Sequence, residues 1–114
     1  MARSVTWTEL AWQDLERAVD TIAQDSPTYA AGFARRVWER AQSLDELSYR
    51  GRVVPELGDP DVRELILASY RLLYEIRGET VYILGLIHGA RDLTALWTRE
   101  GESRRDDPGT PRSH

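Results

Sequence analysis

The stretch Leu73–Leu93, LYEIRGETVYILGLIHGARDL, is the most informative about the fold because it holds most of two strands and the turn between them. Tyr70–Arg77 alternates as a half-buried strand does, whereas Thr80–His88 is apolar on both faces, which is typical of a central strand. Between them, Gly78-Glu79 is a two-residue turn of the kind that begins with glycine. The stretch therefore predicts an antiparallel hairpin whose second strand runs into His-Gly-Ala-Arg-Asp.

The turn also predicts which side chains share a face, because cross-strand partners point the same way. A two-residue turn places Arg71 opposite Leu86, so that His88 becomes the diagonal neighbour of Arg71. The side chains expected on this face are Arg71, Glu75, Arg77, Tyr82 and His88. The other face is more apolar, so we expect it to lie beneath helices and the Arg71 face to be open.

A short strand and a helix are expected near the N-terminus. Residues 3–7 favour a strand, and Thr6 with Glu9 three residues later is a capping-box pattern. Apolar residues then recur at helical spacing between Ala11 and Ile22, which predicts an amphipathic helix.

A second helix follows almost directly. Ser26 is placed to cap it and Pro27 to occupy its first turn. The apolar stripe from Ala30 to Leu47 indicates about five turns. Because the connection is so short, the two helices must form an antiparallel hairpin.

The element order is completed by a loop at residues 52–61 and a strand at residues 62–68, which give β-α-α-β-β-β. We expect an α+β domain in which the helix hairpin packs on one face of a small antiparallel sheet, with residues 3–7 beside the last strand. The globular domain should span residues 1–100, and residues 101–114, rich in Gly, Ser, Pro and charge, should form a flexible charged tail.

The composition is that of one small folded domain without disulfides. The chain has 114 residues, of which 41% are hydrophobic, and a net charge of −4. Cysteine is absent and all 15 basic residues are arginines, which excludes a thiolate nucleophile, a lysine base and a Schiff base. The N-terminus lacks the apolar run of a signal peptide, and no segment approaches the ~20 apolar residues of a membrane span, so we expect a cytoplasmic protein without membrane contact.

Four short motifs stand out in the second half of the chain. They are Gly51-Arg52-Val53-Val54-Pro55-Glu56, Arg63-Glu64-Leu65, Tyr70-Arg71-Leu72-Leu73-Tyr74 and His88-Gly89-Ala90-Arg91-Asp92. In this order and spacing they resemble the RelE/ParE superfamily of bacterial toxins from type II toxin–antitoxin systems, and the resemblance covers about residues 3–97. It implies a helix hairpin on a small antiparallel sheet, in agreement with the element order.

The resemblance implies one of two activities. ParE-like members act on DNA gyrase, whereas RelE-like members are ribosome-dependent mRNA endonucleases that usually carry catalytic lysines. The motifs look most like the ParE-like branch, often described as plasmid stabilisation proteins, and the chain has no lysine. The resemblance therefore implies a gyrase poison without a cofactor, held in a hetero-oligomer with a cognate antitoxin whose C-terminal segment covers the helix hairpin and the sheet edge.

The alternative is a metal-independent mRNA interferase. Some interferases similar to RelE use a glutamate, an arginine and a histidine, and Glu56, Arg71 and His88 fall near the matching places. Arg71 would hold a phosphate, His88 would protonate the leaving oxygen and Glu56 would activate a 2′-hydroxyl. A third hypothesis is a degenerate family member that binds its antitoxin and poisons nothing.

Each of these candidates also has a purely structural interpretation. The glutamates that could pair with Arg71 are Glu56, Glu64 and Glu75. In that interpretation His88 forms a hydrogen bond at the end of its strand and fixes the following turn. Glu56 then binds backbone amides or pairs with Arg63.

Further candidate contacts with a target or partner are Arg63, Arg77, Tyr82 and Arg91. Tyr82 could stack on a base or meet the antitoxin, and Arg91 could contact a phosphate or pair with Asp92. Apart from the terminal His114 the chain has one histidine, so no metal site is expected.

Overall fold

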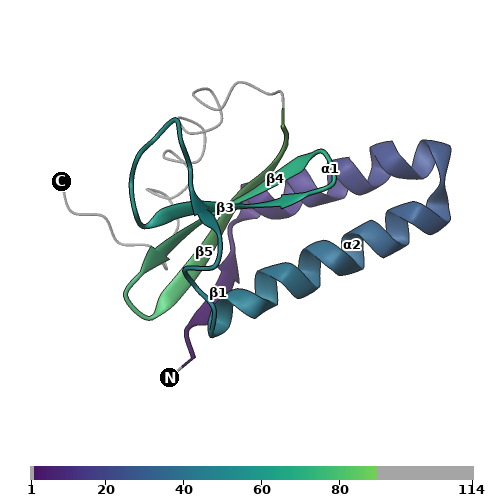
Figure 1. The fold of residues 1–114 in the computed structure, drawn as a ribbon. Helices are drawn as coiled ribbons and strands as arrows, with labels where there is room; N and C mark the ends of the chain where they lie inside the picture. Colours follow the sequence, from purple (N-terminus) through teal and green to yellow (C-terminus); the bar gives the residue numbers. More distant parts are fainter. Residues whose placement is uncertain (1, 90–114) are drawn as a thin grey trace.

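The computed structural model describes residues 2–89, which form a five-stranded mixed sheet with two helices on one face (Figure 1). The helices are α1 (Glu9–Asp25) and α2 (Pro27–Gln42), followed by the 3₁₀ turn η1 (Ser43–Asp45). The strands are β1 (Ser4–Trp7), β2 (Arg52–Val53), β3 (Val62–Leu67), β4 (Tyr70–Arg77) and β5 (Thr80–His88). The sheet order is β1-β5-β4-β3-β2. The expected α+β class, with a helix hairpin on one face of the sheet, is confirmed.

One edge of the sheet differs from the expected antiparallel arrangement. Strands β2 to β5 form an antiparallel ladder, but β1 pairs in parallel with β5, with Ser4 opposite Thr80. The Ser4 amide donates to the Glu79 carbonyl at 2.9 Å, and the Thr8 amide donates to the Ile83 carbonyl at 3.1 Å. A parallel pair needs a long crossover, and the whole of the chain between β1 and β5 supplies it. The prediction of a fully antiparallel sheet is therefore wrong at this edge.

The segment expected to be a loop at residues 52–61 begins with the short strand β2. Arg52 lies opposite Glu64, and Val53 lies opposite Arg63. The sheet thus gains an edge strand of two residues, and this strand places an arginine directly beside a glutamate of β3.

Helix α1 begins at a cap two residues later than expected. Thr6 belongs to β1, and Thr8 is the N-cap, whose hydroxyl oxygen accepts a hydrogen bond from the Ala11 amide at 3.1 Å. The same hydroxyl donates to the Ile83 carbonyl at 3.0 Å, so the cap also ties the helix to β5. Ser26 caps α2 as predicted.

Both helices are of ordinary length for a small domain. Helix α2 ends at Gln42, so the apolar stripe that reached Leu47 overestimated it, and Leu47 is 57% exposed. Among residues 2–89, no helix is long and apolar enough to cross a membrane.

The main core lies between the helix hairpin and the sheet. Its buried side chains include Leu15, Phe33, Val37, Leu44, Leu72, Tyr74, Val81, Ile83 and Leu86. Burying one such large apolar side chain contributes roughly 1.5–3 kcal/mol. Both helices and strands β3, β4 and β5 supply this core, so it joins the helix hairpin to the middle of the sheet.

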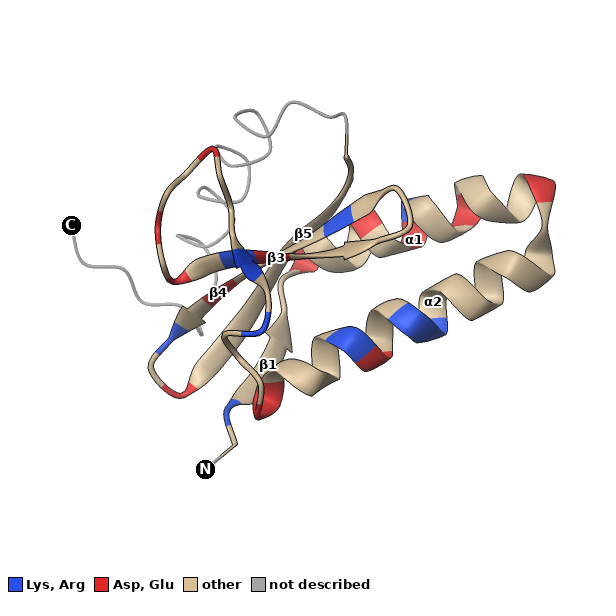
Figure 2. Ribbon diagram, viewed as in Figure 1, with Lys and Arg blue, Asp and Glu red and all other residues tan. Residues whose placement is uncertain are grey.

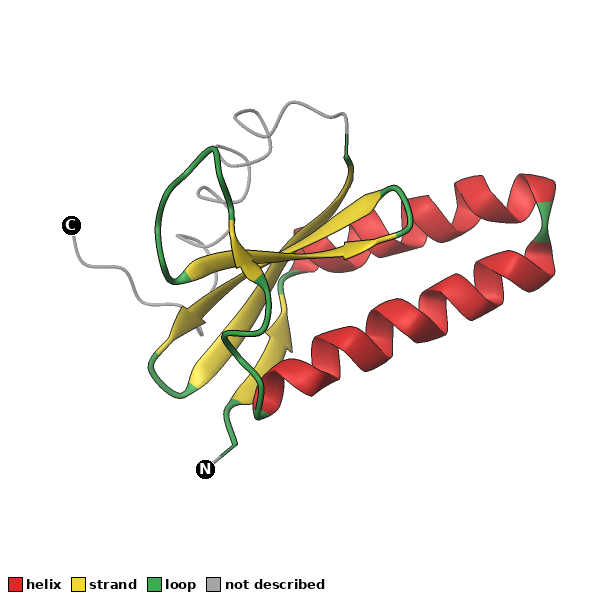
Figure 3. Ribbon diagram, viewed as in Figure 1, coloured by secondary structure: helices red, strands yellow, loops and turns green. Residues whose placement is uncertain are grey.

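The opposite face of the sheet is not open as expected. A smaller buried cluster lies there, formed by Val54, Val62, Leu73, Tyr82, Leu84 and Ile87. Val54 and Val62 bound the loop between β2 and β3, which projects away from the helices (Figure 3). The ends of this loop therefore cover part of the face that the sequence predicted to be bare.

A β-bulge in β5 changes the face of every side chain near the end of the hairpin. The register runs Tyr74 opposite Ile83, Leu73 opposite Gly85, Arg71 opposite Ile87 and Tyr70 opposite His88. Leu84 is therefore the extra residue. The predicted register is correct from the turn as far as Tyr74 and wrong beyond it, because one inserted residue moves the later side chains to the other face.

Asp14 of α1 braces β5 just after the bulge. The residue is only 4% exposed, and its Oδ2 accepts a hydrogen bond from the Leu86 amide at 3.2 Å. Its Oδ1 accepts a hydrogen bond from Nη2 of Arg17 at 2.9 Å. A buried carboxylate is stable when its oxygens are hydrogen-bonded in this way, so α1 fixes the position of the end of β5.

Replacing Asp14 by alanine should lower the free energy of unfolding by roughly 1–3 kcal/mol, because the buried Leu86 amide loses its acceptor. Urea denaturation followed by circular dichroism measures this loss. Arg17→Ala is the matched control: the Arg17 side chain is 63% exposed, so its removal should cost less than about 1 kcal/mol. Equal losses in the two variants would show that the Arg17 pair, and not the contact with Leu86, matters at this place.

Candidate functional site

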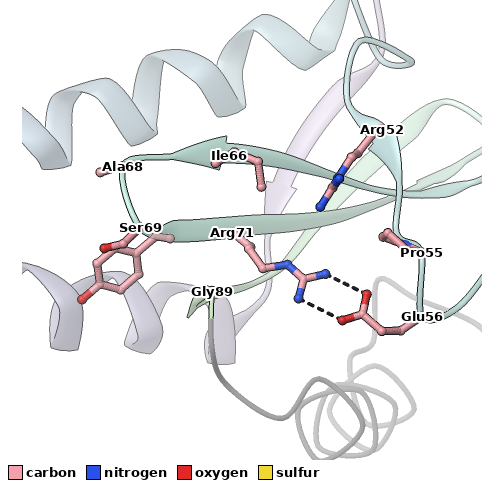
Figure 4. A pocket seen from close by; sticks show the side chains of 9 residues that line it. Arg52, Pro55, Glu56, Ile66, Ala68, Ser69, Arg71 and Gly89 are labelled. Atoms are coloured by element: carbon pink, nitrogen blue, oxygen red, sulfur yellow. Dashed lines mark hydrogen bonds and ion pairs between the residues drawn. The ribbon is translucent and has the colours of Figure 1, made fainter.

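Arg71 of β4 lies on the face away from the helices, and the residue is only 8% exposed. Its Nε donates to Oε1 of Glu64 at 2.7 Å. Its Nη1 and Nη2 donate to the two oxygens of Glu56 at 3.0 and 2.9 Å, the pair drawn with dashed lines in Figure 4. Two carboxylates therefore hold the guanidinium, one of them in a bidentate pair, which explains a charged side chain buried in mid-strand. Of the pairings expected for Glu56, the one with Arg71 forms.

Glu64 anchors this network from the neighbouring strand. Its side chain is fully buried, and its Oε2 accepts a hydrogen bond from Nε of Arg52. Arg52 lies directly opposite Glu64, and Arg71 lies diagonally across from it, so three adjacent strands bring three charged side chains together. Because a buried carboxylate without a counter-charge is very unfavourable, Glu64 depends on these arginines.

The pairing changes the ionisation of both partners. The hydrogen bonds from Arg71 lower the pKa of Glu56 below its ordinary value of 4.5, against a smaller opposing effect of burial. The hydrogen bonds to Glu56 raise the pKa of Arg71, again against the effect of burial. Glu56 is thus a weaker base than an ordinary glutamate. The formal charges of the two arginines and two glutamates sum to zero.

The Arg71–Glu56 pair borders a cavity of about 380 Å³. The cavity is lined by Arg52, Pro55, Glu56, Ile66, Ala68, Ser69, Tyr70, Arg71 and Gly89. Charged side chains, those of Arg71 and Glu56, form one wall of the cavity. Pro55 and the half-exposed Ile66 form an apolar wall. Figure 2 shows acidic and basic positions side by side around β3. This arrangement is suited to a ligand that carries both charge and apolar surface.

His88 lies on the other side of the sheet from Arg71. It pairs with Tyr70, and the two rings meet edge-on with 5.5 Å between their centroids and 78° between their planes. His88 borders a smaller hollow of about 170 Å³ together with Asp14 and Arg17 of α1. The expected proximity of Arg71 and His88 is therefore wrong, and the bulge in β5 is the physical reason.

Arg63 is held by backbone carbonyl groups at the edge of the sheet. Its guanidinium donates to the carbonyl oxygens of Pro60, Gly51 and Tyr49 at 2.8, 2.9 and 3.3 Å. It also lies 4.9 Å from the centre of the Tyr49 ring. These contacts join the segments before β2 and β3, which gives Arg63 a clear structural role.

Arg77 and Tyr82 contact each other, with the guanidinium carbon 5.5 Å from the ring centre. Tyr82 is only 8% exposed and belongs to the smaller buried cluster, so it has little surface on which a base could stack. Arg91, the remaining candidate contact, lies outside the described residues.

Two members of the network, Glu64 and Arg52, are not among the candidate residues predicted from the sequence. There, Glu64 is only one of three possible partners of Arg71, and Arg52 is only part of a motif in an expected loop. The signal that could have identified Glu64 was its setting: a single carboxylate between Val62 and Leu65 in an apolar strand needs a counter-charge nearby.

No metal centre is formed by residues 2–89, where no three His, Cys, Asp or Glu side chains gather as ligands. What the described site can do chemically is recognise a planar anion, because the fork of Arg71 already holds one in the form of Glu56.

Comparison with known proteins identifies the class to which this fold and site belong. A family model described as the ParE toxin of the type II toxin–antitoxin system, parDE, matches residues 5–93. The chain is therefore a type II toxin of the RelE/ParE superfamily. Because the match covers most of the chain, it belongs to the ParE toxin family. A search of curated proteins gave no match.

Solved structures share the fold. A chain from the structure of the chromosomal ParDE toxin–antitoxin system of P. aeruginosa is 23% identical and has a TM-score of 0.64, with 76% of this chain and 96% of that chain covered. A chain of the toxin–antitoxin complex RelBE2 from Mycobacterium tuberculosis is 26% identical with a TM-score of 0.54, with 77% and 99% covered. A free Escherichia coli RelE toxin carrying two arginine-to-alanine changes is 16% identical with a TM-score of 0.59, with 90% and 97% covered.

Glu64→Gln should destabilise the domain far more than Glu56→Gln. Losing the buried carboxylate leaves Arg71 without its interior counter-charge, which should lower the free energy of unfolding by roughly 3–5 kcal/mol. Glu56 is half-exposed, with 47% of its side chain accessible, so its replacement should cost about 0–1 kcal/mol. Urea denaturation compares the two, and similar losses would mean that the carboxylates are equivalent partners.

The lowered pKa of Glu56 predicts an acid-sensitive contribution to stability. A carboxyl group whose pKa is lower in the folded state stabilises the fold above its unfolded pKa, and this stabilisation is lost as the pH falls through the folded pKa. The difference in free energy of unfolding between the wild type and Glu56→Gln should therefore stay constant above about pH 6 and shrink below about pH 4.5. Urea denaturation at several pH values tests this, and a difference that survives acidification contradicts it.

Proposed function

We propose that this chain is the ParE-like toxin of a type II toxin–antitoxin system, that it poisons DNA gyrase, and that a cognate antitoxin neutralises it. The observation that carries the proposal is the match of the ParE family model over residues 5–93. Gyrase is a cytoplasmic target, so the proposal places the toxin in the bacterial cytoplasm, where it forms a hetero-oligomer with its antitoxin.

The geometry of the arginine site supports gyrase over mRNA cleavage. Both Nη groups of Arg71 are bound by Glu56, so in this conformation they do not face a free phosphate site. His88 lies on the opposite face of the sheet and cannot act on a group held by Arg71. Since the chain also lacks lysine, the residue types expected of the nuclease branch do not converge here.

The surface of the helix hairpin supports an antitoxin partner. Trp12 of α1 and Trp38 of α2 are both 45% exposed, although each packs against Trp7 of β1. A hollow of about 490 Å³ lies along α1, lined by Trp12, Leu15, Glu16, Val19, Asp20 and Ala34. Exposed aromatic side chains beside an apolar hollow are typical of protein interfaces.

The second candidate function is a ribosome-dependent mRNA interferase. The observation in its favour is that Glu56 and Arg71 border a cavity together, at the places that the resemblance implies for a base and a phosphate ligand. Under the interferase hypothesis, Glu56 dissociates from Arg71 when RNA binds, and His88, on the other face of the sheet, does not contribute to cleavage.

Purified protein added to DNA gyrase and relaxed plasmid should inhibit supercoiling and raise the amount of linear DNA in cleavage complexes. Topoisomerase I acting on the same plasmid is the control and should be unaffected. Normal supercoiling at a molar excess of the protein would refute the gyrase target.

Ribosome-bound mRNA incubated with the same protein distinguishes the second candidate. The gyrase proposal predicts intact mRNA. Cleavage that falls by roughly 10²-fold or more in Arg71→Gln would instead make Arg71 a catalytic residue. Expression in cells without antitoxin separates the third hypothesis, because a toxin that poisons nothing allows normal growth.

A further inference from the structure

The two carboxylates on Arg71 are held very differently. Glu64 lies in the middle of the sheet, its side chain is fully buried, and Arg52 holds its second oxygen. Glu56 lies in the loop after β2, and 47% of its side chain is exposed. Glu64 is therefore a permanent counter-charge, whereas Glu56 can leave without any strand moving.

The departure of Glu56 would expose a ready-made anion site. Arg71 would keep its bond to Glu64 through Nε, which fixes the plane of the guanidinium, while both Nη groups would face the cavity. Two arginines would then face a single remaining carboxylate, so the site would carry a net positive charge. A fork held in one orientation binds a planar carboxylate through two parallel hydrogen bonds.

A second donor is already present beside this fork. Arg52 is bound to Glu64 through Nε, its side chain is 62% exposed, and among residues 2–89 its two Nη groups have no hydrogen-bond partner. Arg52 and Arg71 line the same cavity. An incoming carboxylate could therefore form hydrogen bonds with both arginines, whereas the hydrogen bonds of Glu56 go to Arg71 and it feels Arg52 only through its charge.

The rest of the cavity indicates a protein ligand rather than a nucleic acid. Pro55 and Ala68 line it with Ile66, whose side chain is 51% exposed at the rim. Such a wall fits an aliphatic side chain beside the acidic one. Glu64 would also remain next to Arg71 and repel a second negative charge of a phosphate chain.

We propose that the Arg71 fork is a carboxylate-exchange site, in which an acidic side chain of a partner protein, next to an aliphatic residue, replaces Glu56 on Arg71 and also contacts Arg52. In the free toxin Glu56 occupies the site as an internal competitor at high effective concentration. The inference rests on the proposed function in one respect, since the antitoxin is the partner that would supply the acidic side chain.

The test measures how tightly the full chain binds a blocked hexapeptide, Ac-Leu-Leu-Glu-Leu-Leu-Ser-NH₂. The affinity is read by NMR titration from the change in the Nε–H signal of Arg71. Glu56→Ala should bind the peptide roughly tenfold more tightly than the wild type, because the internal competitor is gone. Glu79→Ala is the matched control: it removes the same charge from the exposed turn between β4 and β5, and it should bind as the wild type does. The same peptide with glutamine in place of glutamate should gain nothing from Glu56→Ala.

Two further variants locate the site. In the Glu56→Ala background, Arg71→Lys keeps a positive charge beside Glu64 but removes the fork, and it should abolish the gain. Arg52→Gln in that background should reduce the gain in part. A circular dichroism spectrum of each variant confirms that it is folded.

Any of three results would overturn the proposal. The first two are that Glu56→Ala binds the peptide no more tightly than the wild type, and that the gain in peptide affinity persists when Arg71→Lys is added. The third is that Glu56→Ala binds inorganic phosphate more tightly than it binds the peptide. The last result would assign the site to phosphate. These results are separate from the gyrase and growth experiments, so a protein that arrests growth but shows no exchange would retain the proposed function and lose only this inference.

Discussion

The extra residue in β5 determines how chemical groups are distributed over the two faces of this domain. Leu84 has no partner in β4, so each later side chain of β5 lies on the face opposite to the one a regular ladder would give it. As a result, Ile87 pairs with Arg71 and His88 pairs with Tyr70. A bulge disrupts the hydrogen bonds of the ladder. Here the Leu86 amide, just beyond the bulge, donates a hydrogen bond to the Asp14 carboxylate of α1 instead. The helix hairpin therefore does more than cover the core, because it stabilises the irregularity that separates Arg71 from His88.

The ionic network on the far face depends on the same arrangement. With Ile87 opposite Arg71 and His88 on the other face, the environment of the guanidinium is apolar on the β5 side and ionic on the β3 side. A buried arginine is tolerated there because Glu64 and Glu56 pair with all of its nitrogen positions. One of those partners is buried and the other half-exposed, and this asymmetry makes the site able to exchange ligands.

Proteins with this fold include toxins described as ParE, RelBE2 and RelE, so the fold alone does not determine the target. The target of each protein with this fold therefore depends on the residues of its site. In this chain the site has arginine and glutamate without lysine, and its histidine lies on the other face. Those features are the basis of our proposal that the chain recognises a protein surface and does not cleave RNA.

The α+β class, the strands β4 and β5 with the turn between them, the cap at Ser26 and the family could all be predicted from the sequence, because each depends on local periodicity, turn chemistry or short motifs. The sequence could not determine the parallel pairing of β1, since nothing local distinguishes a parallel from an antiparallel neighbour across so long a crossover. It did not locate the bulge, although Gly85 was a weak signal, because a glycine inside a strand can mark either a bulge or a close backbone approach. Only the tertiary structure placed Asp14 on the Leu86 amide and Glu64 under Arg71, since both contacts join residues that come together when separate elements pack.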